Sequence, residues 1–312
     1  MTDQAARPDK LDPPGPKRVG RRSFWTVFLV VGLLVLILGS GLVGLAWITS
    51  EDNLWSSGEG IGVIEIEGII AHSAPVLEAL DRYRQSSKVK AIIIRIDSPG
   101  GGVAATQEIY KEIEKVKKEK KVVAAMGSVA ASGGLYIASA ADKVFANPGT
   151  VTGSIGVIMQ MLNMEEIVGK IGLKPVVIKS GKFKDAGSAF RPMTDEDKAV
   201  FQKIVDQLYM QFVRDVAKGR RLDPEKVKTM ADGRIYTGEE AKTLGLVDEL
   251  GNFEDAVAFA QKIAGISGRR HLIYPPKKES WLKELFSNQL GFNVLPEWPR
   301  PLSFQYLYSP GY

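Results

Sequence analysis

Strand and helix patterns alternate along the chain beyond residue 60. Short runs rich in Val and Ile predict strands over 62–68, 91–96 and 122–126, and amphipathic patterns predict helices over 75–84 and 108–120. Parallel strands need a crossover connection of a dozen or more residues, which is the size of these helical segments. The sequence therefore predicts an α/β domain with a mainly parallel sheet.

Two loops rich in small residues follow predicted strands, at 97–102 and at 127–134. In parallel sheets, ligands bind at the carboxyl ends of the strands. Glycine lets main-chain N–H groups approach a substrate closely, and such donors form oxyanion holes. Closing a turn is the commoner role of glycine in a single loop, and neither loop has the spacing of a nucleotide-binding motif. Together the two loops are interpreted as opposite walls of one site.

Four serines lie near predicted strand ends and are candidate nucleophiles: Ser98, Ser128, Ser132 and Ser154. Ser132 is the best of them because it precedes a Gly-Gly pair and opens a helix of small residues over 135–141, where developing negative charge is favoured. Its alternative role is that of a helix N-cap.

A serine nucleophile needs a base, and this chain has only two histidines, His72 and His271, neither beside a glycine-rich turn. They do not strictly exclude a Ser-His-Asp triad, which is defined by geometry. A lysine base is the alternative, and it has to be neutral, which requires burial in an apolar site. On this reasoning Lys179, Lys182 and Lys184 are equally good candidates for the base.

The chain has no cysteine, which excludes a thiolate nucleophile, a disulfide framework and a cysteine metal site.

An uncharged, apolar segment covers residues 23–48. A helix of this length spans the roughly 30 Å hydrocarbon core of a bilayer. Residues 1–22 before it carry six Lys/Arg and three Asp, and acidic residues follow it, so the positive-inside rule predicts a cytoplasmic N-terminus and an exported remainder. The segment exceeds the apolar core of a signal peptide, about 7 to 15 residues, which favours an uncleaved anchor.

The position of this predicted anchor also defines the segments on either side of it. Residues 1–22 are predicted to be a disordered basic arm, and residues 49–60 a linker. The arm holds most of the formal net charge of +5, so no basic nucleic-acid face is predicted.

Four motifs together resemble the signal peptide peptidase A (SppA) family in its short, single-repeat form, and they lie at residues 91–102, 131–136, 152–157 and 180–188. Members of this family are bacterial membrane-anchored Ser/Lys peptidases of peptidase family S49. The resemblance covers roughly residues 60–265. It implies a ClpP/crotonase-like fold, with a peptidase domain over 61–268 and a C-terminal extension over 269–312.

Carried over residue by residue, the resemblance implies that Ser132 is the nucleophile and Lys184 the general base, with Ser154 orienting the lysine. It implies main-chain oxyanion donors at Gly101 and Gly133, with Gly100 and Gly102 as neighbours that could substitute.

The resemblance also implies an activity and its setting. Hydrolysis through an acyl-enzyme would need no metal or cofactor, and the substrates would be released signal peptides and other extended apolar peptides. Members are homo-oligomers with sites built partly from neighbouring subunits. The expected location is the bacterial inner membrane, with the catalytic domain on the periplasmic side.

Two other functions stay open on the sequence. One is a crotonase-like acyl-CoA enzyme, although an exported domain would not meet cytosolic CoA. The other is a non-catalytic membrane scaffold.

Capping-box patterns predict helices over 194–218 and 237–244. These helices pack either between protomers or on the protomer's own core.

The last segment, 281–312, combines aromatic residues with four prolines and is not one continuous helix. It is either a surface-packed or disordered terminus or an extended strand docked in a peptide groove.

Overall fold

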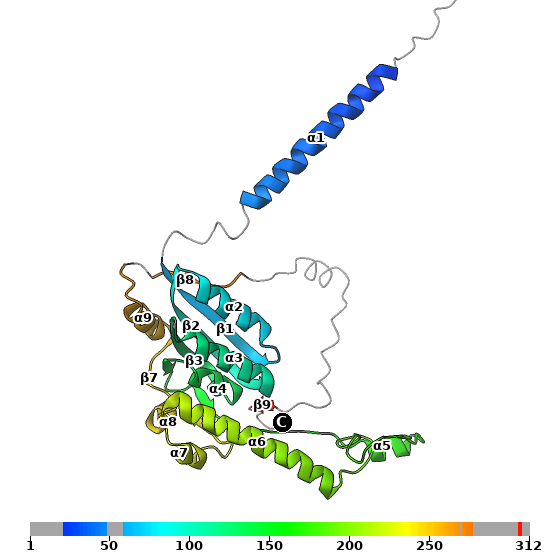
Figure 1. The fold of residues 1–312 in the computed structure, drawn as a ribbon, viewed down its shortest axis with the longest axis vertical. Helices are drawn as coiled ribbons and strands as arrows, with labels where there is room; N and C mark the ends of the chain where they lie inside the picture. The colour runs from blue at the N-terminus through cyan, green and yellow to red at the C-terminus, as the bar shows by residue number, and fades with distance from the viewer. Residues whose placement is uncertain (1–20, 49–58, 269, 277–304, 308–312) are drawn as a thin grey trace, which may run out of the picture. The chain divides into compact units, whose positions relative to one another are not determined.

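The computed structural model describes residues 21–48, 59–268, 270–276 and 305–307 (Figure 1). The chain divides into two compact units, residues 1–56 and 57–312, and each is described by itself. Most of the predicted basic arm, most of the linker and most of the C-terminal extension lie outside the described residues.

The described part of the first unit is the helix α1 (Arg21–Ile48), which includes the apolar segment. Its leucine-rich sequence suits a helix, because side chains without a branch at Cβ lose little rotamer freedom there. Within the described residues, the structure has no helix that combines the length and apolar character needed to cross a membrane. The predicted transmembrane helix is therefore not supported by the structure.

The second unit alternates strands and helices. Its strands are β1 (Gly60–Ile70), β2 (Val89–Gly102), β3 (Lys121–Ala131), β4 (Lys143–Ala146), β5 (Val151–Gly153), β6 (Ile235–Thr237), β7 (Glu249–Leu250), β8 (Leu272–Ile273) and β9 (Gln305–Leu307). Its helices are α2 (Ala74–Gln85), α3 (Val103–Val116), α4 (Gly133–Ser139), α5 (Glu165–Lys170), α6 (Asp195–Arg220), α7 (Pro224–Thr229), α8 (Gly238–Leu244) and α9 (Phe253–Ile263).

The described strands form one nine-stranded sheet with the main order β6-β5-β3-β2-β1-β8. The central pairs β1–β2 and β2–β3 are parallel, whereas β5–β6 and β2–β9 are antiparallel. The predicted α/β class with a mainly parallel sheet is confirmed.

Helices cover both faces of this sheet (Figure 1). Ala91 and Ile93 of β2 contribute to the core cluster under α9, while α2, α3 and α4 also contact the central strands. Along β2, residues 91–94 and 96 are all buried. A strand buried on both faces reads as a continuous apolar run, which is why this segment was recognisable in the sequence.

The strand ends differ from the prediction. The predicted loop 97–102 is a continuation of β2, and the first part of the predicted loop 127–134 belongs to β3. Ser98 pairs with Ala130, and Gly100 and Gly101 pair with the end of β1. Glycines suggested loops, but here they let main chains come close enough to pair.

Both predicted capping boxes are confirmed. Thr194 and Asp197 cap α6, and Thr237 and Glu240 cap α8. Near its end, α6 approaches α4 so closely that a Cβ at Gly219 would lie 2.1 Å from the carbonyl oxygen of Ser139. The long helix α6 thus packs on the protomer's own core, directly behind the helix that Ser132 precedes.

Candidate active site

Ser132 lies at the junction of β3 and α4, with φ 53° and ψ −112°. This left-handed region is costly for a residue with a Cβ, and such strain persists only where the surroundings impose it. Two hydrogen bonds do so here: the Ser132 N–H donates to the Gly153 carbonyl (2.8 Å), and the Tyr136 N–H donates to the Ser132 carbonyl (2.9 Å).

The hydroxyl of Ser132 is buried, with the residue 1% exposed, and finds no hydrogen-bond partner among the described residues. It does not cap α4, so the N-cap role left open by the sequence is not adopted. A buried polar group without a partner costs free energy, which calls for an explanation other than stability. An uncommitted serine hydroxyl on strained backbone is suited to act as a nucleophile.

The two predicted oxyanion donors lie side by side next to Ser132. A Cβ built on Gly133 would lie 3.2 Å from the Gly101 nitrogen, and a Cβ on Gly100 would lie 2.8 Å from the Gly133 nitrogen. A Cβ on Gly101 would lie 2.2 Å from the Ile70 carbonyl oxygen. Only glycine allows three main chains to meet in this way.

Ser154, the predicted lysine-orienting residue, is largely buried and also has a positive φ, 51°. Its N–H donates to the Arg234 carbonyl (2.7 Å), and the preceding carbonyl, of Gly153, accepts the Ser132 N–H. Ser132 is therefore hydrogen-bonded to the residue that precedes Ser154, which brings the two strained serines close together.

The other candidate nucleophiles have different surroundings. The Ser98 hydroxyl donates to the Gly68 carbonyl (2.6 Å) and accepts the Gly100 N–H (3.1 Å), which is a structural role. Ser128 is exposed.

The two histidines do not pair with Ser132, since its hydroxyl has no partner among the described residues. His72 is exposed, and the carbonyl of His271 accepts the N–H of Ile61 at the start of β1. His271 thus lies near the amino ends of the parallel strands, whereas Ser132 lies beyond the carboxyl end of β3.

Lys184, the predicted base, is exposed and makes no hydrogen bond with the Ser132 hydroxyl. It lies in the segment between α5 and α6, which Figure 1 shows extending away from the sheet. The structure of a single chain therefore does not bring the predicted dyad together.

The three lysines that the sequence left open differ in their partners. Lys179 forms an ion pair with Asp185 (2.7 Å) and Lys182 with Glu196 (2.5 Å). The side chain of Lys184 has no ion pair or hydrogen bond with any residue in the described ranges. Of the three lysines, Lys184 is thus the one without a carboxylate partner in the described part of the chain.

Arg191 ties the lysine-bearing segment to the start of α6. Its guanidinium contacts the carboxylates of Asp197 (2.6 Å) and Asp185 (3.0 Å). Arg191, followed by Lys179, lowers the pKa of Asp185 to about 2, so this carboxylate is charged at neutral pH. The residue next to Lys184 is thus anchored.

A strand from the C-terminal segment runs beside the same glycines. β9 pairs antiparallel with the end of β2, with Tyr306 opposite Gly101 and Leu307 opposite Gly100. Of the two roles left open for this segment, strand docking is therefore the one observed at residues 305–307.

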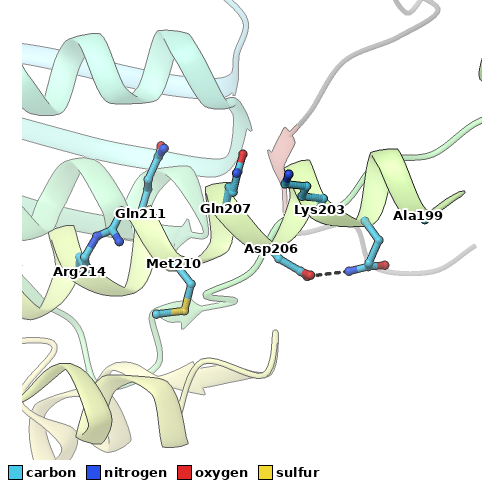
Figure 2. Close-up of a pocket in the computed structure, with 8 residues that line it drawn as sticks. Ala199, Lys203, Asp206, Gln207, Met210, Gln211 and Arg214 are labelled. Carbon is cyan, nitrogen blue, oxygen red and sulfur yellow. Dashed lines mark hydrogen bonds between the residues drawn. The ribbon is translucent and has the colours of Figure 1, made fainter. Parts of the chain in front are cut away.

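Among the described residues, no group of His, Asp and Glu side chains is arranged to hold a metal ion. A groove of about 630 Å³ runs along α6; Figure 2 labels Asp206 among its lining residues, and the Gln202 side chain donates to the Asp206 carboxylate (2.7 Å). None of the predicted site residues lines this groove.

Sequence reasoning missed two features of the site. The first is Thr106, whose hydroxyl is buried without a partner among the described residues and lies 3.0 Å from where a Cβ on Gly133 would be. The second is the burial of Tyr306. No local pattern marks either residue, because each is defined by neighbours far away in the chain.

A pair of glycine substitutions tests strand addition at this site. In Gly100→Ala, the new Cβ would lie 2.0 Å from the Tyr306 carbonyl oxygen, at a φ of 106° that alanine avoids. In Gly102→Ala, the nearest atom would be at an ordinary 3.7 Å. We expect Gly100→Ala to lower kcat/KM for peptides at least about 100-fold and Gly102→Ala less than about threefold. Equal effects in peptide-hydrolysis assays would contradict this reading.

Comparison with known proteins agrees with these observations. The model of peptidase family S49 matches residues 114–267, and that of Clp protease matches residues 67–152. A Synechocystis protein that is provisionally named a protease is 46% identical to this chain over 213 residues, which cover 68% of this chain and 76% of the relative.

Two further relatives carry related names. A protein provisionally named signal peptide peptidase SppA from Enterococcus faecium is 42% identical, over 60% of this chain and 54% of its own. Protease 4 of Haemophilus influenzae is 34% identical, over 65% of this chain and 34% of its own. The chain therefore belongs to peptidase family S49, the family of signal peptide peptidase A, and is a serine peptidase.

Proposed function

We propose that this protein is an endopeptidase that hydrolyses extended apolar peptides, released signal peptides among them, through a Ser132/Lys184 dyad. The observation that carries the proposal is the pairing of β9 with the glycines beside Ser132. A site that accepts one extended strand offers the same main-chain donors and acceptors to a peptide substrate.

The chemistry follows from the residues of the site. Neutral Lys184 takes the Ser132 hydroxyl proton as the oxygen attacks the peptide carbonyl carbon, and the amides of Gly101 and Gly133 stabilise the oxyanion. Lys184 returns the proton to the amine nitrogen as the C–N bond breaks, which leaves an ester on Ser132. Water, deprotonated by Lys184, attacks this ester, the carboxylic acid product leaves, and Ser132 regains its proton. Ser154 would orient the lysine.

We further propose that Lys184 acts on Ser132 of a neighbouring copy in a homo-oligomer. The segment that carries Lys184 exposes large apolar side chains, with Val176 87% and Ile178 97% exposed. Exposed apolar surface of this kind is typical of protein–protein interfaces. Association would bury the segment and supply the apolar surroundings that a neutral lysine needs.

Attachment to the bacterial inner membrane, with an exported catalytic domain, is a proposal that rests on the sequence of residues 1–52 alone. We expect the full chain to stay with the membrane fraction after alkaline carbonate washing and its catalytic domain to be degraded by protease added to spheroplasts. A protein recovered in the carbonate wash, or one protected in spheroplasts but degraded after lysis, would contradict the proposal.

Substitution of each dyad member tests the chemistry. We expect Ser132→Ala and Lys184→Ala to lower kcat for an apolar peptide about 10³-fold or more, because the pair acts as a unit. Lys182→Ala is the matched control, since Lys182 is paired with Glu196, and should stay active. Retained activity in Lys184→Ala would show that another residue is the general base.

Mixing the two inactive variants tests the shared site. If Lys184 serves a neighbouring copy in a ring, subunits of Ser132→Ala and Lys184→Ala co-assembled in equal amounts should regain about a quarter of wild-type activity, because that fraction of sites receives both intact residues. If each chain supplies its own lysine, every site remains defective. No recovery in proven mixed oligomers would therefore rule out sharing.

A further inference from the structure

Resting on the proposed membrane attachment, we propose that a basic surface at the amino ends of the parallel strands binds the headgroups of anionic phospholipids. This surface, the basic rim, consists of residues 82–90 and 115–121. It belongs to the folded second unit and is separate in sequence from both the apolar segment and the basic arm.

The basic rim concentrates the positive charge of the chain. Its two segments hold nine Lys/Arg against one acidic residue, Glu119, which is a formal net charge of +8. That value exceeds the +5 of the whole chain, so the rest of the chain is net negative. A surface with an excess of one charge attracts partners of the opposite charge.

Hydrogen bonds join the two segments of the rim into one surface. The ammonium group of Lys120 donates to three main-chain carbonyls at the junction of α2 and β2, those of Tyr83, Ser86 and Val89 (2.5, 2.5 and 2.8 Å). Arg84 contacts Glu119 (3.4 Å) between the same two segments. The fold therefore holds these cations together on one side of the unit.

Several ammonium groups of the rim are not neutralised by a carboxylate. Lys118 and Lys121 are exposed and have no ion pair with any residue in the described ranges. Lys117 donates to the Ala140 carbonyl (2.8 Å), which is a neutral partner. Other cations of the rim do pair with carboxylates: Arg84, Lys90 and Lys115.

The cations of the rim also repel one another. Burial, followed by the charge of Lys90, lowers the pKa of Lys120, while the carboxylate of Glu119 acts in the opposite direction. A lowered lysine pKa means that the charged form is destabilised in its surroundings. A layer of phosphate groups would offset this repulsion.

The rim lies where the chain enters the second unit. The N–H of Gly60, the first residue of β1, donates to the Lys88 carbonyl (2.9 Å), and Lys121 of β3 pairs with Ala91 of β2. Residues 49–59 separate Gly60 from the apolar segment, and a chain of this length reaches at most about 40 Å. With the apolar segment in a bilayer, the rim stays within reach of the headgroups, where anionic lipids attract Lys and Arg.

Lipid binding at the rim leaves the active site free. The rim precedes β3, whereas Ser132 follows the carboxyl end of this strand. Each residue of a parallel strand rises about 3.3 Å, so the two ends of this 11-residue strand are roughly 35 Å apart. Substitutions in the rim should therefore change lipid contact without changing the hydrolysis of a soluble peptide.

Fluorescence quenching by labelled lipid tests the rim in the full chain. The chain has no cysteine, so Ser87→Cys, in the exposed turn between α2 and β2, gives a single site for a bimane probe. The protein is reconstituted in vesicles of phosphatidylcholine with or without phosphatidylglycerol, each with the same fraction of lipid carrying a headgroup nitroxide. We expect quenching at least about threefold stronger in the anionic vesicles. Salt at about 1 M, where the Debye length is about 3 Å, should remove the difference.

Charge reversal assigns the contact to the rim. Lys118→Glu with Lys121→Glu should lower quenching in anionic vesicles to the level in phosphatidylcholine. Lys226→Glu with Lys228→Glu makes the same change in charge on α7, which Figure 1 shows far from β8 and the start of β1, so quenching should persist. Both variants should unfold at the wild-type temperature, because the substituted side chains are exposed. Equal quenching in the two kinds of vesicle, or an equal loss in the two variants, would overturn the proposal.

Flotation of the same vesicles separates this inference from the proposed membrane attachment. Flotation with both kinds of vesicle, together with charge-dependent quenching, supports both. Flotation with both kinds and quenching that does not depend on charge leaves the attachment standing and overturns the lipid-binding rim. Flotation with anionic vesicles alone, lost in the Lys118→Glu, Lys121→Glu variant, supports the rim and refutes the apolar anchor.

Discussion

The site depends on the close approach of main chains at the end of β2. At Gly100 and Gly101 the polypeptide passes within contact distance of β1, β9 and the start of α4, and a single Cβ there would overlap main-chain atoms. Because the side chains are absent, the main chains at Gly101 and Gly133 lie close together. The same feature lets an extended chain lie beside Ser132, so the proposed oxyanion stabilisation and peptide binding would have a common physical origin.

The fold supplies rigidity where the site is strained. Ser132 has a positive φ and a buried hydroxyl without a partner in the described structure, both of which cost stability. Packing elsewhere offsets this loss of stability: the central strand of the sheet is buried on both faces, and α6 packs closely against α4. Two main-chain hydrogen bonds hold the strained residue in place: the Ser132 N–H donates to the Gly153 carbonyl, and the Ser132 carbonyl accepts the Tyr136 N–H.

The two proposed dyad members lie in contrasting surroundings. Ser132 is at a rigid, buried junction, whereas Lys184 is on an exposed segment anchored at its base by Arg191. A lysine in water is charged and does not act as a base, so its chemistry requires a partner surface. The proposed sharing of sites between subunits would meet this requirement, and assembly would then be a condition of activity.

The sequence by itself determined the α/β class, the central strands and both capping boxes, and it singled out Ser132 as the best candidate nucleophile. These features are local, because apolar runs, caps and a serine before two glycines are written in consecutive residues. It misjudged the ends of β2 and β3, since a glycine run suggests a loop when no pairing partner is known. Only the tertiary structure decided that Ser132 is strained and unpartnered, that Lys184 lies away from it, and that Tyr306 is buried between Tyr136 and Phe212. Those properties depend on contacts between segments up to about 200 positions apart, which no local pattern encodes.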